Sequence, residues 1–291
     1  MLPNIQVLCL FTKHISNKPM PELPEVEIRR QYLEATSLKQ PIASVLVEDT
    51  KLLTTDYITL QQQLADRQFI STERIGKNLF IYTDKEDVIL RMHFGMTGDL
   101  LYYHNSLDRP RHARIVFEFT SGFNLGFICP RKFERIGLVE SVDGYAKAKK
   151  LAPDALTITF DQFAANIRKR NSLIKPVLLD QAVVAGLGNW IVDEVLFQAK
   201  VHPEKRANVL DEDELKAIYE AIDLVLKTAI KYEARYRDFP SNFLIHVRKW
   251  DDSPYDDVET LTKCPRCSTQ ITRTEVGGRT TFYCPKEQIV D

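Results

Sequence analysis

The stretch MPELPEVE, residues 20–27, is the starting point for interpreting the whole chain. Its second proline, Pro24, suits the first turn of a helix, where its missing N–H forfeits no hydrogen bond. Glu25 and Glu27 follow, and carboxylates in a first turn are stabilised by the positive end of the helix dipole. Apolar side chains then recur at helical spacing. The sequence therefore predicts a helix over residues 21–35.

Pro21 and Glu22, at the start of this stretch, are candidates for covalent catalysis. If Met20 is the initiator and is removed, Pro21 begins the chain with a secondary amine. An α-amino group titrates near pH ~7.7–8.0, so an appreciable fraction is neutral and nucleophilic at neutral pH. Attack on a sugar C1′ or a carbonyl carbon gives an iminium ion, and Glu22 can move protons beside it. A plain helix start without chemistry accounts for the same residues.

The same string resembles the N-terminus of the formamidopyrimidine-DNA glycosylases, which are bifunctional base-excision repair enzymes. The resemblance implies that Pro21 is the nucleophile and Glu22 the proton donor. Residues 1–19 precede the motif, and a retained extension would make the Pro21 nitrogen a tertiary amide without a basic lone pair. We therefore predict that residues 1–19 are a start-site artefact and that translation begins at Met20.

Composition is that of an ordinary globular protein of about two domains. The chain has 291 residues, of which 44% are hydrophobic and 27% charged, and its net charge is −1. The sequence holds no run of about eighteen apolar residues, so it predicts no membrane span. Five cysteines are too few and too unevenly spaced for a secreted disulfide framework, so we expect a reducing cytoplasm, with nucleoid association if the source is bacterial.

Short segments rich in β-branched and aromatic residues dominate the first half, and they predict a sandwich or barrel over residues 20–150. The expected strands are 42–49, 79–83, 88–94, 113–119, 123–129 and 136–140. We place a linker at 145–151. Helical periodicity follows in a domain over 151–240, with helices expected at 160–170, 172–182, 189–199 and 212–233. Residues 241–291 form a third segment.

Several residues of the first domain match family positions that contact DNA. Lys77 lies between two apolar runs, where the family has a phosphate-contacting lysine; an exposed hairpin lysine is the plain alternative. Met96, in a Gly-rich loop, and Arg131 and Phe133, in PRKF, match the side chains that fill the gap left by an extruded base. Extrusion costs a few kcal/mol and needs such a plug. His112 matches a further DNA contact.

The second domain contains GLGNW, residues 186–190, preceded by a basic cluster that includes Lys169 and Arg170. Glycines and a helix start suit close approach of a backbone phosphate. A helix–turn–helix with a glycine C-cap and an asparagine N-cap explains the same residues. The segment also resembles the family's helix–two-turn–helix, with Asn189 at its phosphate-contacting position. Its sequence resembles that of the plant and fungal branch more closely. Because of this similarity, the sequence does not predict which oxidised base the protein prefers.

The C-terminal segment reads Cys264-x2-Cys267-x16-Cys284-x2-Glu287. Two Cys pairs at this spacing predict a zinc site, and here a glutamate takes the fourth place, so both Zn²⁺ bound by Cys264, Cys267, Cys284 and Glu287 and a metal-free finger stay open. Arg279 matches the arginine of the family's finger hairpin, which grips phosphates at the lesion; a guanidinium suits that task.

Together these features predict an α+β multidomain protein: an N-terminal helix-capped β-sandwich, a helical helix–two-turn–helix domain and a C-terminal zinc-finger-like β-hairpin. The resemblance implies a monomeric DNA glycosylase and AP lyase that acts on oxidised purines in damaged double-stranded DNA, with Pro21, Glu22, Lys77 and Arg279 catalytic. Two alternatives remain: an endonuclease VIII-like glycosylase for oxidised pyrimidines, and a catalytically inactive DNA-binding protein.

Overall fold

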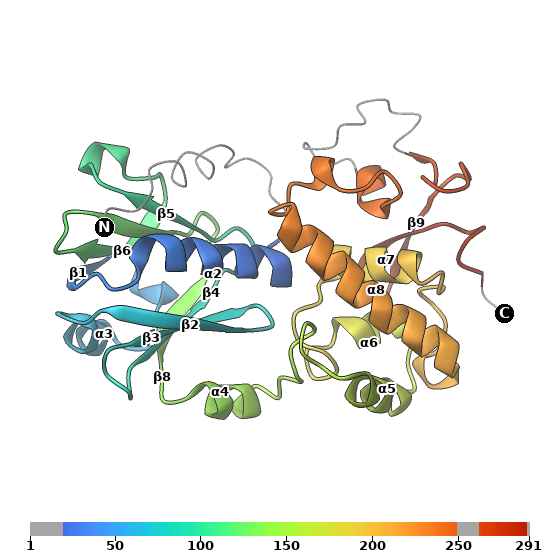
Figure 1. The fold of residues 1–291 in the computed structure, drawn as a ribbon, viewed down its shortest axis with the longest axis horizontal. Helices are drawn as coiled ribbons and strands as arrows, with labels where there is room; N and C mark the ends of the chain where they lie inside the picture. Colours follow the sequence, from blue (N-terminus) through green and yellow to red (C-terminus); the bar gives the residue numbers. More distant parts are fainter. Residues whose placement is uncertain (1–19, 249–261, 290–291) are drawn as a thin grey trace. The chain divides into compact units, whose positions relative to one another are not determined.

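The computed structural model describes residues 20–248 and 262–289 (Figure 1). These residues fall into two compact units. The first, called the sandwich unit, holds Val26–Ala148 and Pro21. The second, called the helical unit, holds Glu22–Glu25 and the chain from Lys149 onward. Residues 22–25, at the start of the first described helix, therefore pack with the helices, although the rest of that helix packs with the strands.

The sandwich unit is built from two four-stranded antiparallel sheets, which confirms the predicted sandwich. One sheet has the order β1-β6-β7-β5 and the other β2-β3-β4-β8. The strands are β1 (Ile42–Val47), β2 (Phe69–Ile75), β3 (Asn78–Thr83), β4 (Ile89–His93), β5 (Asp99–Tyr103), β6 (Ala113–Phe119), β7 (Asn124–Ile128) and β8 (Arg135–Val139). Phe69 and Phe117, one from each sheet, meet edge to face in the shared core, with ring centroids 5.5 Å apart.

Helix α2 (Leu23–Ser37) covers this core, with Val26, Tyr32 and Leu33 buried against the strands. The Tyr32 hydroxyl accepts the backbone N–H of Tyr102 at 2.8 Å, which ties the helix to β5. Helix α3 (Tyr57–Leu64) begins at Asp56, whose carboxylate accepts the Thr59 N–H. The predicted first helix is thus confirmed, and its start lies two residues later than expected.

The structure adds elements that the sequence pattern did not predict. α3, β2 and β5 were not expected, because β2 (FISTERI) alternates weakly and the apolar residues of β5 (DLLYY) do not alternate with polar ones. The boundary between the two units falls after Ala148, within the linker predicted at 145–151. The first part of that linker belongs to helix α4 (Val142–Ala148), where Tyr145 is held by Arg91 and Asn78.

The helical unit contains α5 (Phe160–Arg168), α6 (Ile174–Leu179), α7 (Asn189–Gln198) and α8 (Glu212–Lys231), followed by the hairpin β9 (Thr272–Val276) and β10 (Arg279–Tyr283). A capping box at Asp211 and Glu214 starts α8, as its sequence predicts. Helix α6 is six residues long, shorter than the predicted 172–182, because Leu179 is followed by extended backbone at Asp180. One apolar core joins these helices around Trp190 and Ile191.

Five short 3₁₀ segments connect these elements in the described chain. They are Thr50–Leu52, Ser106–Asp108, Ala207–Val209, Tyr236–Asp238 and Leu244–Arg248. The last two bring a second set of aromatic and polar side chains onto α7. No helix of the described residues is long and apolar enough to cross a membrane.

Candidate active site and nucleic-acid interface

The carboxylate of Glu22 is fixed by the start of helix α7. Its Oε1 accepts the backbone N–H of Trp190 at 3.2 Å, and its Oε2 accepts that of Ile191 at 3.3 Å. The first N–H groups of a helix have no partner within the helix, and they carry the positive end of the dipole. Glu22 is 3% exposed, so this pairing stabilises a carboxylate that is almost wholly buried.

Glycines at the helix–turn–helix make room for this arrangement. A Cβ on Gly188 would lie 2.1 Å from the Glu22 carboxyl carbon, and one on Gly186 would lie 2.4 Å from Leu23. Gly186 also has a φ of +113°, and its carbonyl accepts the Leu23 N–H at 3.2 Å. The glycines predicted to accommodate a phosphate therefore also accommodate Glu22 and Leu23, where helix α2 begins.

Glu25 links this group to the segment after α8, a role beyond the helix-dipole effect expected from its position in the first turn. Its Oε2 accepts the Glu22 N–H at 2.9 Å, as the third residue of a capping box does. Its Oε1 accepts the Tyr236 hydroxyl at 2.6 Å. Tyr236 in turn packs edge to face on the ring of Trp190, with centroids 5.4 Å apart. Glu22 and Glu25 are thus held by one continuous set of buried partners.

A buried ion network fastens the hairpin to the helices. Lys175 is 0% exposed, and its Nζ lies 2.6 Å from Asp193 Oδ1, 2.9 Å from the Thr280 carbonyl and 2.8 Å from Thr281 Oγ1. Arg248 pairs with the other Asp193 oxygen, which also accepts the Phe282 N–H. Burial lowers the pKa of Lys175, and the adjacent Asp193 carboxylate opposes that effect.

One predicted residue, Asn189, belongs to this hairpin network, and another, Arg279, lies beside it on β10. Asn189 donates from Nδ2 to the Thr280 carbonyl at 2.9 Å, so the first residue of α7 contacts β10 directly. Arg279 is exposed at the start of β10, one residue before Thr280. Lys169 and Arg170 lie instead at the end of α5, where Arg170 pairs with Asp180 at 3.3 Å. The network therefore includes Asn189 and supports Arg279, while the other two cations stand apart from it.

Sequence reasoning missed Asp193 and Arg248 in this network. The available signal was the composition of α7, NWIVDEVLFQ, which is apolar around most of its circumference. A carboxylate on such a helix is buried and needs a charged or N–H partner. The neighbouring Glu194 shows the same rule, because it is 1% exposed and accepts the N–H groups of Leu244 and Ile245. Burial raises the pKa of Glu194 to about 7.

In the sandwich unit, Lys77 lies in the tight turn between β2 and β3. Gly76 takes the positive φ of +58° that this turn requires. Asn78 follows, and its side-chain oxygen accepts from Arg91 at 3.1 Å and from the Tyr145 hydroxyl at 3.3 Å. Lys77 is half-buried beside this cluster. The hydrogen bonds of Asn78, the next residue, therefore help to hold the turn in place.

Met96 and Phe133 lie on adjacent loops of the sandwich unit. The loops follow β4 and precede β8, which pair with His93 opposite Arg135. A Cβ on Gly95 would lie 2.6 Å from the Phe133 carbonyl carbon, so the two loops touch through their backbones. Phe133 is 53% exposed, and the Arg131 guanidinium lies 5.5 Å from its ring centre. The predicted plug residues are therefore neighbours.

His93 and His112 shape the surroundings of these loops. His93 Nδ1 accepts the Gly95 N–H at 3.2 Å, and burial beside Arg91, Lys77 and Arg135 lowers the pKa of His93 to about 4. The imidazole is consequently neutral at pH 7. His112 has a φ of +67°, and its carbonyl accepts the N–H of Cys129. Cys129 lies two residues before Arg131 in the sequence. Arg114 bonds the Cys129 carbonyl and adds charge there.

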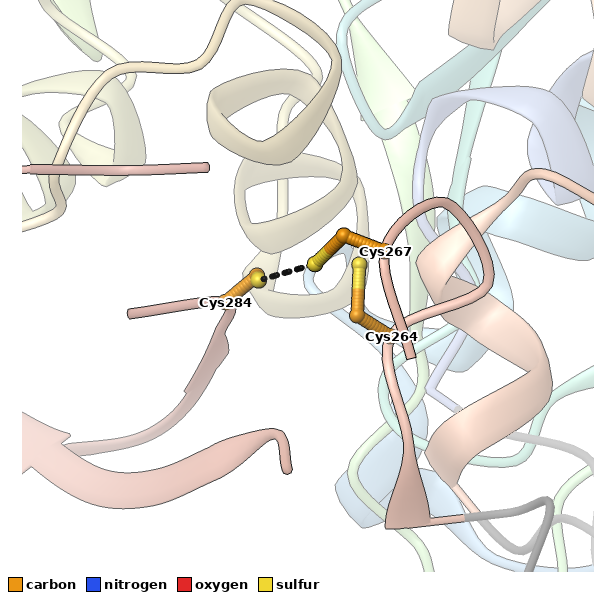
Figure 2. A group of neighbouring side chains, drawn as sticks. All are labelled: Cys264, Cys267 and Cys284. Atoms are coloured by element: carbon orange, nitrogen blue, oxygen red, sulfur yellow. Dashed lines mark hydrogen bonds between the residues drawn. The ribbon is translucent and has the colours of Figure 1, made fainter. Parts of the chain in front are cut away.

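The three C-terminal cysteines converge, as Figure 2 shows, with Cys264 and Cys267 on one loop and Cys284 just after β10. Their sulfur atoms all lie within 4.8 Å of one another, and Cys267 and Cys284 are 3.5 Å apart. Tetrahedral zinc with Zn–S bonds of about 2.3 Å needs sulfurs roughly 3.8 Å apart, so this group fits zinc. Glu287 lies outside the group, and its carboxylate pairs with Lys200 at 3.5 Å.

The described fold combines an antiparallel sandwich, a helix–two-turn–helix and a cysteine-bearing hairpin, which together define a DNA-repair glycosylase. Three family models match: the formamidopyrimidine-DNA glycosylase N-terminal domain at residues 20–136, its H2TH domain at 151–240, and a zinc finger found in FPG and IleRS at 263–286. The chain belongs to the formamidopyrimidine-DNA glycosylase family.

Relatives and solved structures agree with this assignment. The chain is 34% identical to a formamidopyrimidine-DNA glycosylase of Ligilactobacillus salivarius, over 93% of this chain and 99% of that one. It is 31% identical to the enzyme of Arabidopsis thaliana, over 92% of this chain and 71% of that one. A complex of Lactococcus lactis Fpg with DNA containing an abasic site superposes with a TM-score of 0.79 and 31% identity, over 92% and 99% of the two chains.

Proposed function

We propose that this protein excises oxidised purines from double-stranded DNA and then cuts the strand through a Schiff base to Pro21. The observation that carries the proposal is the fixation of Glu22, the residue after Pro21, on two N–H groups of α7. A proton donor must be held in place if it is to act at a sugar. The family to which the chain belongs has the same combination of activities, glycosylase and lyase.

The reaction begins with attack of the Pro21 nitrogen on C1′ of the damaged nucleotide. The C1′–base bond breaks, and the base leaves with a proton supplied from the Glu22 side. The attacking nitrogen gives up its N–H proton, which replaces the one taken by the base, and Glu22 protonates O4′ so that the C1′–O4′ bond breaks and an iminium forms. The iminium acidifies the C2′ proton, whose loss breaks the C3′–O3′ bond, expels the 3′ phosphate and cuts the strand. Lys77 and Arg279 bind the flanking phosphates, a task that suits one ammonium and one guanidinium. Asn189 contributes a further phosphate contact.

Base extrusion is assigned to Met96, Arg131 and Phe133. Extruding a nucleotide costs a few kcal/mol, and a side-chain wedge offsets part of that cost. The exposure of Phe133 and the stacking of Arg131 near it support this assignment. The His112 carbonyl accepts the N–H of Cys129, two residues before Arg131, and His112 binds phosphate in this proposal.

Zinc, where bound, holds the finger loop to the end of β10 through Cys264, Cys267 and Cys284. Its chemistry is structural: it cross-links two segments and takes no part in bond breaking. The protein's own residues also hold the strand, because Lys175 and Asp193 bond to residues 280–282 of β10. Both attachments keep Arg279 in a defined place.

A free Pro21 requires that Met20 be the initiator and be removed. The match to the N-terminal family model begins at residue 20, which supports this start. Intact-mass measurement of natively expressed protein tests it, and a mature N-terminus upstream of Pro21 would exclude the Schiff base. We further infer that the protein acts as a monomer in the compartment that holds the genome, the cytoplasm and nucleoid if the source is bacterial.

Borohydride trapping tests the chemistry directly. We expect a covalent complex with lesion-containing duplex DNA, lost in Pro21→Gly and lost when residues 1–19 are retained. Undiminished trapping by Pro21→Gly would remove Pro21 from its role. A panel of formamidopyrimidine, 8-oxoguanine, hydantoin and oxidised-pyrimidine lesions, each opposite all four bases, identifies the substrate. Faster excision of the pyrimidines would favour the endonuclease VIII-like alternative.

A further inference from the structure

Glu134 is a fully buried carboxylate between the two loops of the proposed wedge. It follows Phe133 directly, and its exposed fraction is 0%. Oε1 accepts the Thr97 hydroxyl at 3.2 Å. Oε2 is buried and has no hydrogen-bond partner among the residues that the structure describes. A buried carboxylate oxygen without a donor costs free energy, so the attachment of this side chain depends on Thr97.

The backbones of the two loops meet at the same place. A Cβ on Gly98 would lie 2.8 Å from Glu134 Cγ, and a Cβ on Gly95 would lie 2.7 Å from the Glu134 nitrogen. Both glycines of the Met96 loop are thus packed against Glu134. A shift of the loop from Gly95 to Gly98 would therefore displace Glu134. A displacement of the Glu134 side chain would in turn open the contact between the two loops.

We propose that Glu134 is a positioning residue that joins the loop of Met96 to the loop of Arg131 and Phe133, so that the three side chains enter DNA as one rigid wedge. This rests on the wedge assigned above. The Thr97–Glu134 hydrogen bond is the specific link, because Thr97 follows Met96 and Glu134 follows Phe133 in the sequence. Separated loops would have to be ordered on each encounter with DNA, and that ordering lowers affinity.

The matched pair Thr97→Val and Thr97→Ser tests the link. Valine keeps the shape and removes the hydroxyl, leaving both Glu134 oxygens unpaired, whereas serine keeps the donor. Wedge entry is measured with duplex DNA that contains a tetrahydrofuran site opposite 2-aminopurine, whose fluorescence rises when it is unstacked. We expect Thr97→Val to reduce the fluorescence change and to weaken binding roughly tenfold, on the scale of one lost hydrogen bond to a buried carboxyl oxygen. Thr97→Ser should behave as the unaltered protein.

Single-stranded DNA with an abasic site is the internal control, because no stacked partner has to be displaced there. We expect lyase activity on it to be unchanged in Thr97→Val, and thermal melting to show that the variant is folded. Glu134→Ala should reproduce the fluorescence defect. Normal fluorescence and duplex affinity in both variants would overturn the positioning role. Absence of lyase activity in the unaltered protein would overturn the proposed function instead, while the fluorescence comparison would still decide the role of Glu134.

Discussion

The Glu22 carboxylate lies against Gly188, at the point where helix α7 begins, and a Cβ at residue 188 would come within 2.1 Å of its carboxyl carbon. Gly188 has φ −128° and ψ −168°, extended backbone that any residue adopts, so the constraint is steric contact and not backbone strain. One glycine therefore determines where the proposed proton donor can lie.

Gly188→Ala should displace Glu22 from the N–H groups of Trp190 and Ile191. Because positioned proton transfer contributes about 10²–10⁴-fold to rate, we expect base excision to slow by roughly 10²-fold. Single-turnover kinetics on a lesion duplex measures this. Combining it with Glu22→Asp, whose carboxyl sits one methylene nearer the backbone, should restore part of the rate. No recovery in the double variant would mean that the alanine acts elsewhere.

Glu22→Gln should separate the two activities. The amide keeps the size of the side chain and cannot supply the proton, so we expect excision to fall by about 10²–10⁴-fold. Cleavage at a preformed abasic site needs no departing base, and should fall much less. Parallel assays on the two substrates give the ratio. Equal losses on both would show that Glu22 serves strand cleavage as much as base release.

The sequence predicts the sandwich and the helical domain because strand alternation and helix periodicity are local signals. It also indicates Asn189, Arg279 and the cysteines through spacing. It does not predict that Glu22–Glu25 packs with the helices, because this depends on contacts between residues more than 160 positions apart, as from Glu22 to Trp190. The same applies to Lys175, whose partners Thr280 and Thr281 belong to another segment.

Lys175→Met should destabilise the helical unit. It leaves Asp193 with one cation fewer in a site that is 1% exposed, and breaking a buried pair from one side costs about 3–5 kcal/mol. Chemical denaturation measures the loss. The double variant Lys175→Met with Asp193→Leu should recover a large part of it, because no unpaired charge then remains at that point. A single variant as stable as the unaltered protein would show that Arg248 alone balances Asp193.

Stability should fall as the pH decreases from about 6.5 to about 4 because of His93. Burial lowers the pKa of His93 to about 4, below its ordinary 6.5, so the unfolded chain binds an additional proton in this window. The stabilisation is complete above pH ~6.5 and is lost on acidification, by up to about 3 kcal/mol. Denaturation curves at several pH values, compared with His93→Gln, isolate this contribution. An identical pH profile in the variant would assign the loss to other groups.

Zinc content should follow the three cysteines and not Glu287. Purified protein is expected to hold one zinc ion, since thiolate sites bind it with on the order of 10 kcal/mol or more at pH 7. Cys264→Ser should lose the ion, and with it the attachment of the finger loop to the end of β10, so duplex affinity should fall with it. Glu287→Ala should keep the ion, because Glu287 lies outside the sulfur group and pairs with Lys200. Elemental analysis of both variants decides the matter: zinc retained in Cys264→Ser would refute the assigned ligands, and zinc lost in Glu287→Ala would restore the carboxylate as the fourth.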